Sequence, residues 1–163
     1  MTHTGNPFGQ VLVALVTPMT ADGEVDWPAV EKHMEDVITA GADGIVVTGT
    51  TGETSTLTDA EKIRLVEVGR DVAAGRARVI TGGGSNETAH AIALYKASEK
   101  AGADGIMIVT PYYNKPTQAG GHTHFPSFPQ REIEMCAEKM EAFWRERMPL
   151  THAAFNANGR VAP

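Results

Sequence analysis

Short apolar runs alternate with helical patterns along the first two thirds of the chain. Four runs of strand length occur at residues 11–16, 45–48, 78–81 and 106–109. Runs of this kind, without strict alternation of polar and apolar positions, are typical of strands covered on both faces, as in parallel sheets. The chain is therefore expected to be an α/β protein with four strand–helix steps and right-handed crossovers.

The segments between these runs predict helices with recognisable starting points. Asp26 is expected to cap the first helix through its side chain. Thr58 and Glu61 have the spacing of a capping box at the start of the second helix. Ser85 or Asn86 is expected to cap the third.

One motif occurs twice. The sequence Ala-Gly-Ala-Asp-Gly-Ile stands at residues 40–45 and again at residues 101–106, each time where a helix ends and a strand begins. The separation corresponds to about two βα units of ~30 residues each. A doubly wound sheet and a (β/α)₈ barrel both fit this local pattern.

The glycine patterns argue against nucleotide binding. No Gly-x-Gly-x-x-Gly follows the first strand, so the dinucleotide fingerprint of a doubly wound sheet is missing. The run Gly82-Gly83-Gly84 could cradle a phosphate, but no Lys-Ser or Lys-Thr follows it.

The candidate chemistry lies at the ends of the strands. The sequence Gly49-Thr50-Thr51-Gly52-Glu53 follows the second run. Its glycines are expected to let the backbone turn and bring N–H groups close to a ligand, and its hydroxyls could bind an anion or relay a proton. Thr17-Pro18 and Thr110-Pro111-Tyr112-Tyr113 end two other runs. In a barrel these ends form the mouth of the active site.

Composition excludes several classes of protein. The chain has 163 residues, 42% of them hydrophobic, and a formal net charge of −6. This charge argues against nucleic-acid and anionic-membrane partners. The single cysteine, Cys136, excludes an internal disulfide framework and fits a reducing cytoplasm. No signal peptide and no run of ~20 apolar residues is recognised, so a cytoplasmic location is expected.

Three motifs together resemble a known family. Val16-Thr17-Pro18-Met19, Gly49-Thr50-Thr51-Gly52-Glu53-Thr54 and the stretch at residues 109–116 are similar to those of 4-hydroxy-tetrahydrodipicolinate synthases, also called dihydrodipicolinate synthases. These enzymes belong to the pyruvate-dependent class I aldolases and lyases. The resemblance runs from about Phe8 to about Phe125. It implies a partial (β/α)₈ TIM barrel, comprising the first four βα units.

The resemblance also implies a chemistry. In this family a lysine forms a Schiff base with pyruvate, and the enamine attacks L-aspartate 4-semialdehyde, in lysine and diaminopimelate biosynthesis. Thr51 and the neighbouring amides, Gly49 included, would hold the pyruvate carboxylate. Thr50 and Tyr113 would belong to a hydroxyl proton relay, with Tyr113 reaching across a dimer interface of a homo-oligomer. Packing or interface contacts are the other interpretation of the tyrosines. No cofactor is implied.

The chain departs from the family after residue 125. We expect residues 1–125 to form the half-barrel and residues 126–163 to form an unrecognised tail with one amphipathic helix at about 131–148. The strand that carries the family's Schiff-base lysine is not recognised. The lysines of the chain are Lys32, Lys62, Lys96, Lys100, Lys115 and Lys139. All but Lys115 fall on predicted helices, and the family's pattern gives Lys115 the place of a loop cation.

These departures predict a truncated synthase that is inactive alone. A non-catalytic half-barrel or assembly module is one alternative. A related pyruvate aldolase such as N-acetylneuraminate lyase is another, although those enzymes usually carry serine at the position of Thr50. A metal site at His122 and His124 is a third possibility, with His152 near in sequence. Since no carboxylate or cysteine joins them at a typical ligand spacing, no metal is expected.

Overall fold

A four-stranded parallel sheet organises the described part of the protein. The computed structural model describes residues 7–109, which lie within one compact unit, Met1–Pro116. The strands are β1 (Leu12–Ala14), β2 (Gly44–Val47), β3 (Arg78–Gly82) and β4 (Gly105–Met107). Their order in the sheet is β1-β2-β3-β4, and every neighbouring pair is parallel. Strand order that follows the sequence without reversal is the order of a (β/α)₈ barrel, whereas a doubly wound sheet reverses direction.

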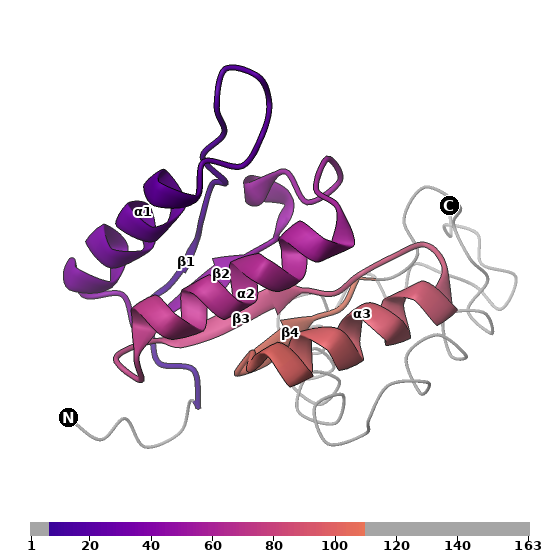
Figure 1. Ribbon diagram of the computed structural model, residues 1–163. Helices are drawn as coiled ribbons and strands as arrows, with labels where there is room; N and C mark the ends of the chain where they lie inside the picture. Colours follow the sequence, from indigo (N-terminus) through magenta and orange to yellow (C-terminus); the bar gives the residue numbers. More distant parts are fainter. Residues whose placement is uncertain (1–6, 110–163) are drawn as a thin grey trace, which may run out of the picture. The chain divides into compact units, whose positions relative to one another are not determined.

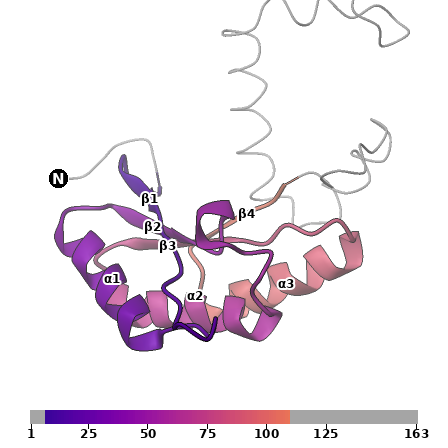
Figure 2. The same ribbon diagram turned by 90° about the horizontal axis from the view of Figure 1, so that it is seen from above.

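Three helices form the outer layer (Figure 1). They are α1 (Trp27–Thr39), α2 (Asp59–Ala73) and α3 (Thr88–Ala101), and a short 3₁₀ turn, η1 (Thr50–Gly52), follows β2. All three lie on the same side of the sheet (Figure 2). The core between sheet and helices contains Ile45, Val47 and Val79 from the strands and Met34 and Val66 from the helices, all nearly inaccessible to solvent.

The other face of the sheet is open within the described residues. Leu12, Val16, Met107 and Val109 are between 41% and 54% exposed. The sequence predicts strands covered on both faces. Within the described residues this holds only for the face that the three helices cover. Four parallel strands with helices on one face are a partial barrel, whose interior face is the open one.

The N-terminal segment covers part of this open face. A Cβ on Gly105 would lie 2.8 Å from Cε1 of Phe8, and one on Gly44 would lie 2.7 Å from Cδ2 of Leu12. Because glycine leaves room at both positions, the two apolar side chains lie directly on the backbone. Both glycines are consequently buried.

Two of the predicted helix starts are confirmed and one is wrong. Asp26 accepts a hydrogen bond from the N–H of Ala29 at 3.1 Å, and Thr58 and Glu61 form the complete capping box. The third helix begins after Glu87, whose side chain makes no capping bond. Ser85 lies too far from the helix start to cap it and instead accepts a bond from the N–H of Glu87 at 3.3 Å.

The aspartate of the repeated motif accepts backbone hydrogen bonds at the start of a neighbouring strand. The carboxylate of Asp43 accepts hydrogen bonds from the N–H groups of Gln10 and Val11, at 2.7 and 2.9 Å, next to β1. Asp104, in the second copy, accepts one from the N–H of Val79 at 2.9 Å, in β3. Each aspartate thus joins the loop before its own strand to the beginning of the neighbouring strand.

Some predictions lie outside the described residues. They are the boundary at residue 125, the helix at about 131–148, Cys136 and Tyr113. In the part of the chain that the structure describes, every helix is too short or too polar to cross a bilayer.

Candidate functional site

The loop after β2 takes its shape from two residues that are not glycines. Thr48 has φ of 53° and Glu53 has φ of 54°, so both adopt the left-handed conformation. Gly49 is extended, with φ of −76° and ψ of −179°, and Gly52 ends the 3₁₀ turn. The expectation that the glycines would provide the turn is wrong, because the positive φ angles fall on their neighbours.

Thr48 is held in this conformation by a buried hydrogen-bond network. Its Oγ1 lies 2.7 Å from Oγ1 of Thr81, accepts from the N–H of Gly82 at 2.9 Å and lies 3.1 Å from the Gly82 carbonyl oxygen. Both threonine side chains are 1% exposed. A β-branched residue at positive φ has a strained backbone. Such a conformation persists only where the surrounding contacts hold it, and it is concentrated at functional sites. The sequence did not single out Thr48, because it reads as the last residue of an ordinary strand.

Gly52 is needed for close packing. A Cβ at this position would lie 3.1 Å from the carbonyl oxygen of Leu15 and 3.1 Å from Oγ1 of Thr17. The hydroxyl of Thr17 donates to the Gly52 carbonyl at 2.8 Å and is buried. This contact confirms that the ends of β1 and β2 meet, as the strand pattern predicts. The third strand end, at residues 110–113, lies outside the described residues.

Thr50 and Thr51 project from this rigid base into solvent. Both residues are exposed, and neither hydroxyl has a hydrogen-bond partner among residues 7–109. The turn is closed by bonds from the N–H of Gly52 to the Gly49 carbonyl and from the N–H of Glu53 to the Thr50 carbonyl. The amides of Thr50 and Thr51 take no part in these two bonds. The loop therefore presents two hydroxyls at the carboxyl end of a buried strand.

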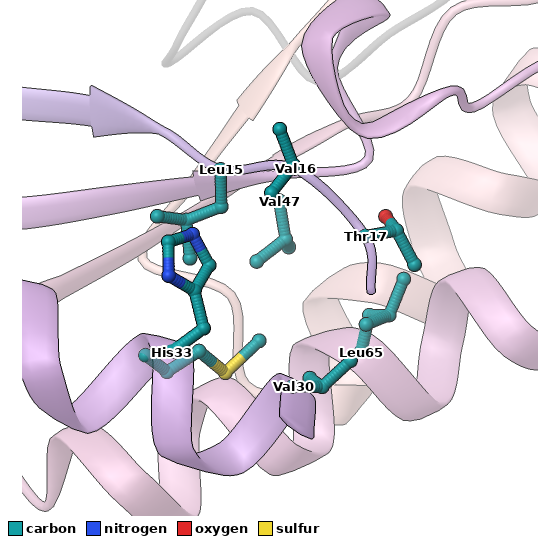
Figure 3. A pocket seen from close by; sticks show the side chains of 8 residues that line it. Leu15, Val16, Thr17, Val30, His33, Val47 and Leu65 are labelled. Carbon is teal, nitrogen blue, oxygen red and sulfur yellow. The ribbon is translucent and has the colours of Figure 1, made fainter. Parts of the chain in front are cut away.

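A small pocket lies beside this loop, between β1, β2, α1 and α2 (Figure 3). It is lined by Leu15, Val16, Thr17, Val30, His33, Met34, Val47 and Leu65. Its polar groups are the Thr17 hydroxyl, which already donates to Gly52, and the imidazole of His33. Because the remaining lining is apolar, this pocket is poorly suited to a carboxylate or phosphate.

No lysine in the described residues occupies the end of a strand. Lys32 lies on α1, Lys62 on α2, and Lys96 and Lys100 on α3. This confirms the prediction from sequence for these four. Lys115 and Lys139 lie outside the described residues.

No group of three metal-ligating side chains is found between residues 7 and 109. The possible metal site considered in the sequence analysis, at His122 and His124, lies outside that range.

Comparison with known proteins agrees with the resemblance in sequence. The family model described as the dihydrodipicolinate synthetase family matches residues 7–131. A 4-hydroxy-tetrahydrodipicolinate synthase of Streptomyces coelicolor is 48% identical over 119 residues, which are 73% of this chain and 40% of the relative. That of Acidiphilium cryptum is 54% identical over 118 residues. The chain thus spans about 40% of the length of the curated relatives that it matches.

Solved structures give the same result. The chloride-inhibited dihydrodipicolinate synthase of Acinetobacter baumannii, complexed with pyruvate, superposes with a TM-score of 0.72 at 46% identity. The alignment covers 74% of this chain and 41% of that one. The enzyme of Cyanidioschyzon merolae, with lysine bound, superposes with a TM-score of 0.70 at 47% identity. With a family match over most of its length and the strand order of a partial barrel, the chain belongs to the dihydrodipicolinate synthetase family.

Proposed function

We propose that the loop after β2 is the carboxylate-binding part of a site for the condensation of pyruvate with L-aspartate 4-semialdehyde, in lysine biosynthesis. The observation that carries this proposal is the pair of hydroxyls of Thr50 and Thr51, which are exposed and have no hydrogen-bond partner among residues 7–109, on a base fixed by Thr48 and Thr17. The relatives at about half identity are named as this synthase, and the Acinetobacter baumannii structure is described as a pyruvate complex.

The proposed roles rest on the chemistry of the groups and on the resemblance to the family. The hydroxyl of Thr51 and the neighbouring backbone amides, Gly49 included, would hold the pyruvate carboxylate, since hydroxyls and N–H groups are good donors to an anion. Thr50 would pass a proton between substrate and Tyr113, because a hydroxyl both donates and accepts. In this proposal Tyr113 comes from a second copy in a homo-oligomer.

The positions of the described lysines limit the proposal to non-covalent binding of pyruvate. A Schiff-base lysine must lie next to the substrate and needs a lowered pKa from burial or a neighbouring cation. The four described lysines lie on helices that cover the outside of the sheet. We therefore propose that residues 7–109 bind pyruvate without forming the covalent intermediate.

Pyruvate binding can be measured by NMR titration of the full chain. We expect chemical-shift changes at Thr50 and Thr51, and we expect the Thr51→Val variant to bind several-fold more weakly. Thr39→Val is a matched control, because Thr39 is an exposed threonine at the far end of α1. If Thr51→Val bound pyruvate as tightly as the control, the assignment of the carboxylate site would be wrong.

Borohydride reduction in the presence of pyruvate tests the covalent step. Intact mass and peptide mapping are expected to show no pyruvyl adduct on Lys32, Lys62, Lys96 or Lys100. An adduct on any of these four would contradict the proposal.

A non-catalytic assembly module is the second candidate. The apolar face of the sheet that stays open within residues 7–109 favours it, since a parallel sheet is normally covered on both faces. Pyruvate binding that is absent in a folded sample, together with a stable self-association, would support this candidate over the first.

A further inference from the structure

A second polar cluster lies apart from the loop after β2. The imidazole of His90, in the first turn of α3, joins two side chains from different elements. Its Nδ1 lies 2.9 Å from Oγ of Ser85, in the segment after β3, and its Nε2 lies 2.7 Å from Oδ2 of Asp59, at the start of α2. Neither the carboxylate-binding proposal nor the helix caps give this serine–histidine–aspartate chain a role.

The direction of the hydrogen bonds follows from the charge of Asp59. Its pKa is lowered, chiefly by the hydrogen bond from His90, so it is ionised at neutral pH and only accepts. The Nε2 of a neutral His90 must therefore carry the proton. Its Nδ1 then carries no proton, and its lone pair accepts a hydrogen bond from the hydroxyl of Ser85.

The surroundings hold this arrangement in place. Lys62 lies 3.4 Å from the other oxygen of Asp59, and its side chain is only 14% exposed. The N–H of Glu87 donates to Ser85 Oγ at 3.3 Å, which fixes the position of this oxygen beside the imidazole. Ser85 and His90 are both partly exposed, so a small molecule can reach the oxygen.

We propose that Ser85 is a nucleophilic serine that is acylated by activated carboxylic esters, with His90 as its general base. The arrangement has the three parts that an acyl-transfer nucleophile requires: a hydroxyl, a base within hydrogen-bond distance, and a carboxylate that orients the base. Asp59 acts through His90 and is a positioning residue.

The reaction balances without a cofactor. The Ser85 oxygen adds to the carbonyl carbon of the ester, and its proton passes to His90 Nδ1. The carbon–oxygen bond to the alcohol then breaks, and the alcohol leaves with that proton. Water hydrolyses the acyl-serine by the same route, so that ester and water give carboxylic acid and alcohol.

The test uses the full chain and p-nitrophenyl acetate as the probe. Peptide mapping after a short exposure is expected to find acetyl on Ser85 at about 10²-fold or more above Ser55, in line with general-base assistance. Ser55 is an internal control, because it is exposed and has no histidine partner among the described residues. Equal acetylation of the two serines, or acetyl only on lysines, would overturn the proposal.

Variants separate activation from simple exposure. His90→Gln preserves a hydrogen-bonding side chain but is not a base, and it is expected to lower the acetylation rate of Ser85 at least about tenfold. Ser85→Ala must lose the fast p-nitrophenol release. A His90→Gln protein that reacts as fast as the original chain would contradict the assignment of the base.

Rescue by a conservative variant tests the positioning role of Asp59. Asp59→Asn is expected to slow the acetylation of Ser85, because the carboxylate that accepts a hydrogen bond from Nε2 of His90 is removed. Asp59→Glu is expected to restore part of the rate, because it returns a carboxylate. An Asp59→Asn protein that acetylates Ser85 as fast as the original chain would rule out the positioning role, and the wild-type peptide map alone decides the proposal if a variant does not fold.

Discussion

Thr48 shows how one buried side chain shapes the loop that carries the proposed site. Its hydroxyl bonds to Thr81 and to both backbone groups of Gly82, and this network links the end of β2 to the end of β3. The positive φ of Thr48 turns the chain so that the next residues face solvent. The strain is local, and the compensation comes from the neighbouring strand.

Replacing Thr48 by valine is expected to destabilise the protein by about 1–3 kcal/mol. Valine has nearly the same shape, but it leaves the buried N–H of Gly82 and the hydroxyl of Thr81 without their partner. Chemical denaturation measures the change. The double variant Thr48→Val with Thr81→Val should lose less than the sum of the two single variants, because the two hydroxyls share one interaction. Strict additivity would show that the network does not couple them.

Thr50 and Thr51 should behave in the opposite way. Their valine variants are expected to change the free energy of unfolding by less than about 0.5 kcal/mol, since the side chains are exposed and unpaired within the described residues. Thermal unfolding followed by circular dichroism gives this comparison. A large loss of stability would mean that these threonines support the fold, and it would weaken their assignment to ligand binding.

At the scale of secondary structure, the aspartates of the repeated motif connect each strand with its neighbour. Asp43→Ala and Asp104→Ala are each expected to cost about 1–3 kcal/mol, because backbone N–H groups at a strand start lose their acceptor. Asp22→Ala, in an exposed turn, serves as the control. Hydrogen exchange should locate the loss at β1 for Asp43 and at β3 for Asp104. Equal effects of all three variants would show that the motif has no special role.

An ion pair between two helices makes part of the stability dependent on pH. Arg76, beyond the end of α2, donates through Nη1 to Oε1 of Glu35 on α1 at 2.8 Å. The hydrogen bond from Arg76, assisted by one from Thr39, lowers the pKa of Glu35 from its ordinary value of 4.5 to about 2. A carboxyl group with a lowered pKa stabilises the fold above its ordinary pKa, and this stabilisation is lost as the pH falls towards the folded value.

Glu35→Gln should therefore lower the unfolding temperature at neutral pH and lose this effect as the pH falls from 4.5 to about 2. The pair is exposed, so added salt should also shrink the difference between the two proteins. Glu31→Gln, elsewhere on α1, is the control. A difference as large at pH 2 as at neutral pH would have to come from packing and not from the charge of Glu35.

At the scale of the whole described unit, the open face of the sheet is the main departure from an isolated, fully covered domain. Its exposed side chains are apolar, and Val16 and Val109 continue this face just beyond the ends of β1 and β4, whereas the helix-facing side of the sheet contributes to the buried core. Large apolar patches of this kind bind partners or cause association. This property belongs to the arrangement of four strands, not to any one residue.

The double variant Val16→Thr with Val109→Thr is expected to bind less of a hydrophobic dye and to self-associate less, with little change in stability. Threonine keeps the shape of valine and adds a polar group to a solvated surface. Sedimentation velocity and dye fluorescence measure the two effects. Ala93→Ser, on the exposed side of α3, should change neither. If the double variant and this control behaved alike, the open face would not be the associating surface.

The sequence by itself determined the elements and the family. Apolar runs, the capping side chain of Asp26 and the capping box at Thr58 depend on interactions between residues close in the chain, which a local pattern can reveal. The threonine pair was proposed as a binding site in this way too, because it directly follows a buried strand. The tertiary structure decided what depends on neighbours distant in the chain. It determined the strained backbone of Thr48 and its hydrogen bonds to β3. It also determined the hydrogen bonds that Asp43 and Asp104 accept at the start of a neighbouring strand, and the cluster of Ser85, His90 and Asp59. These contacts join different βα units, and they form only when the sheet and its helices pack together.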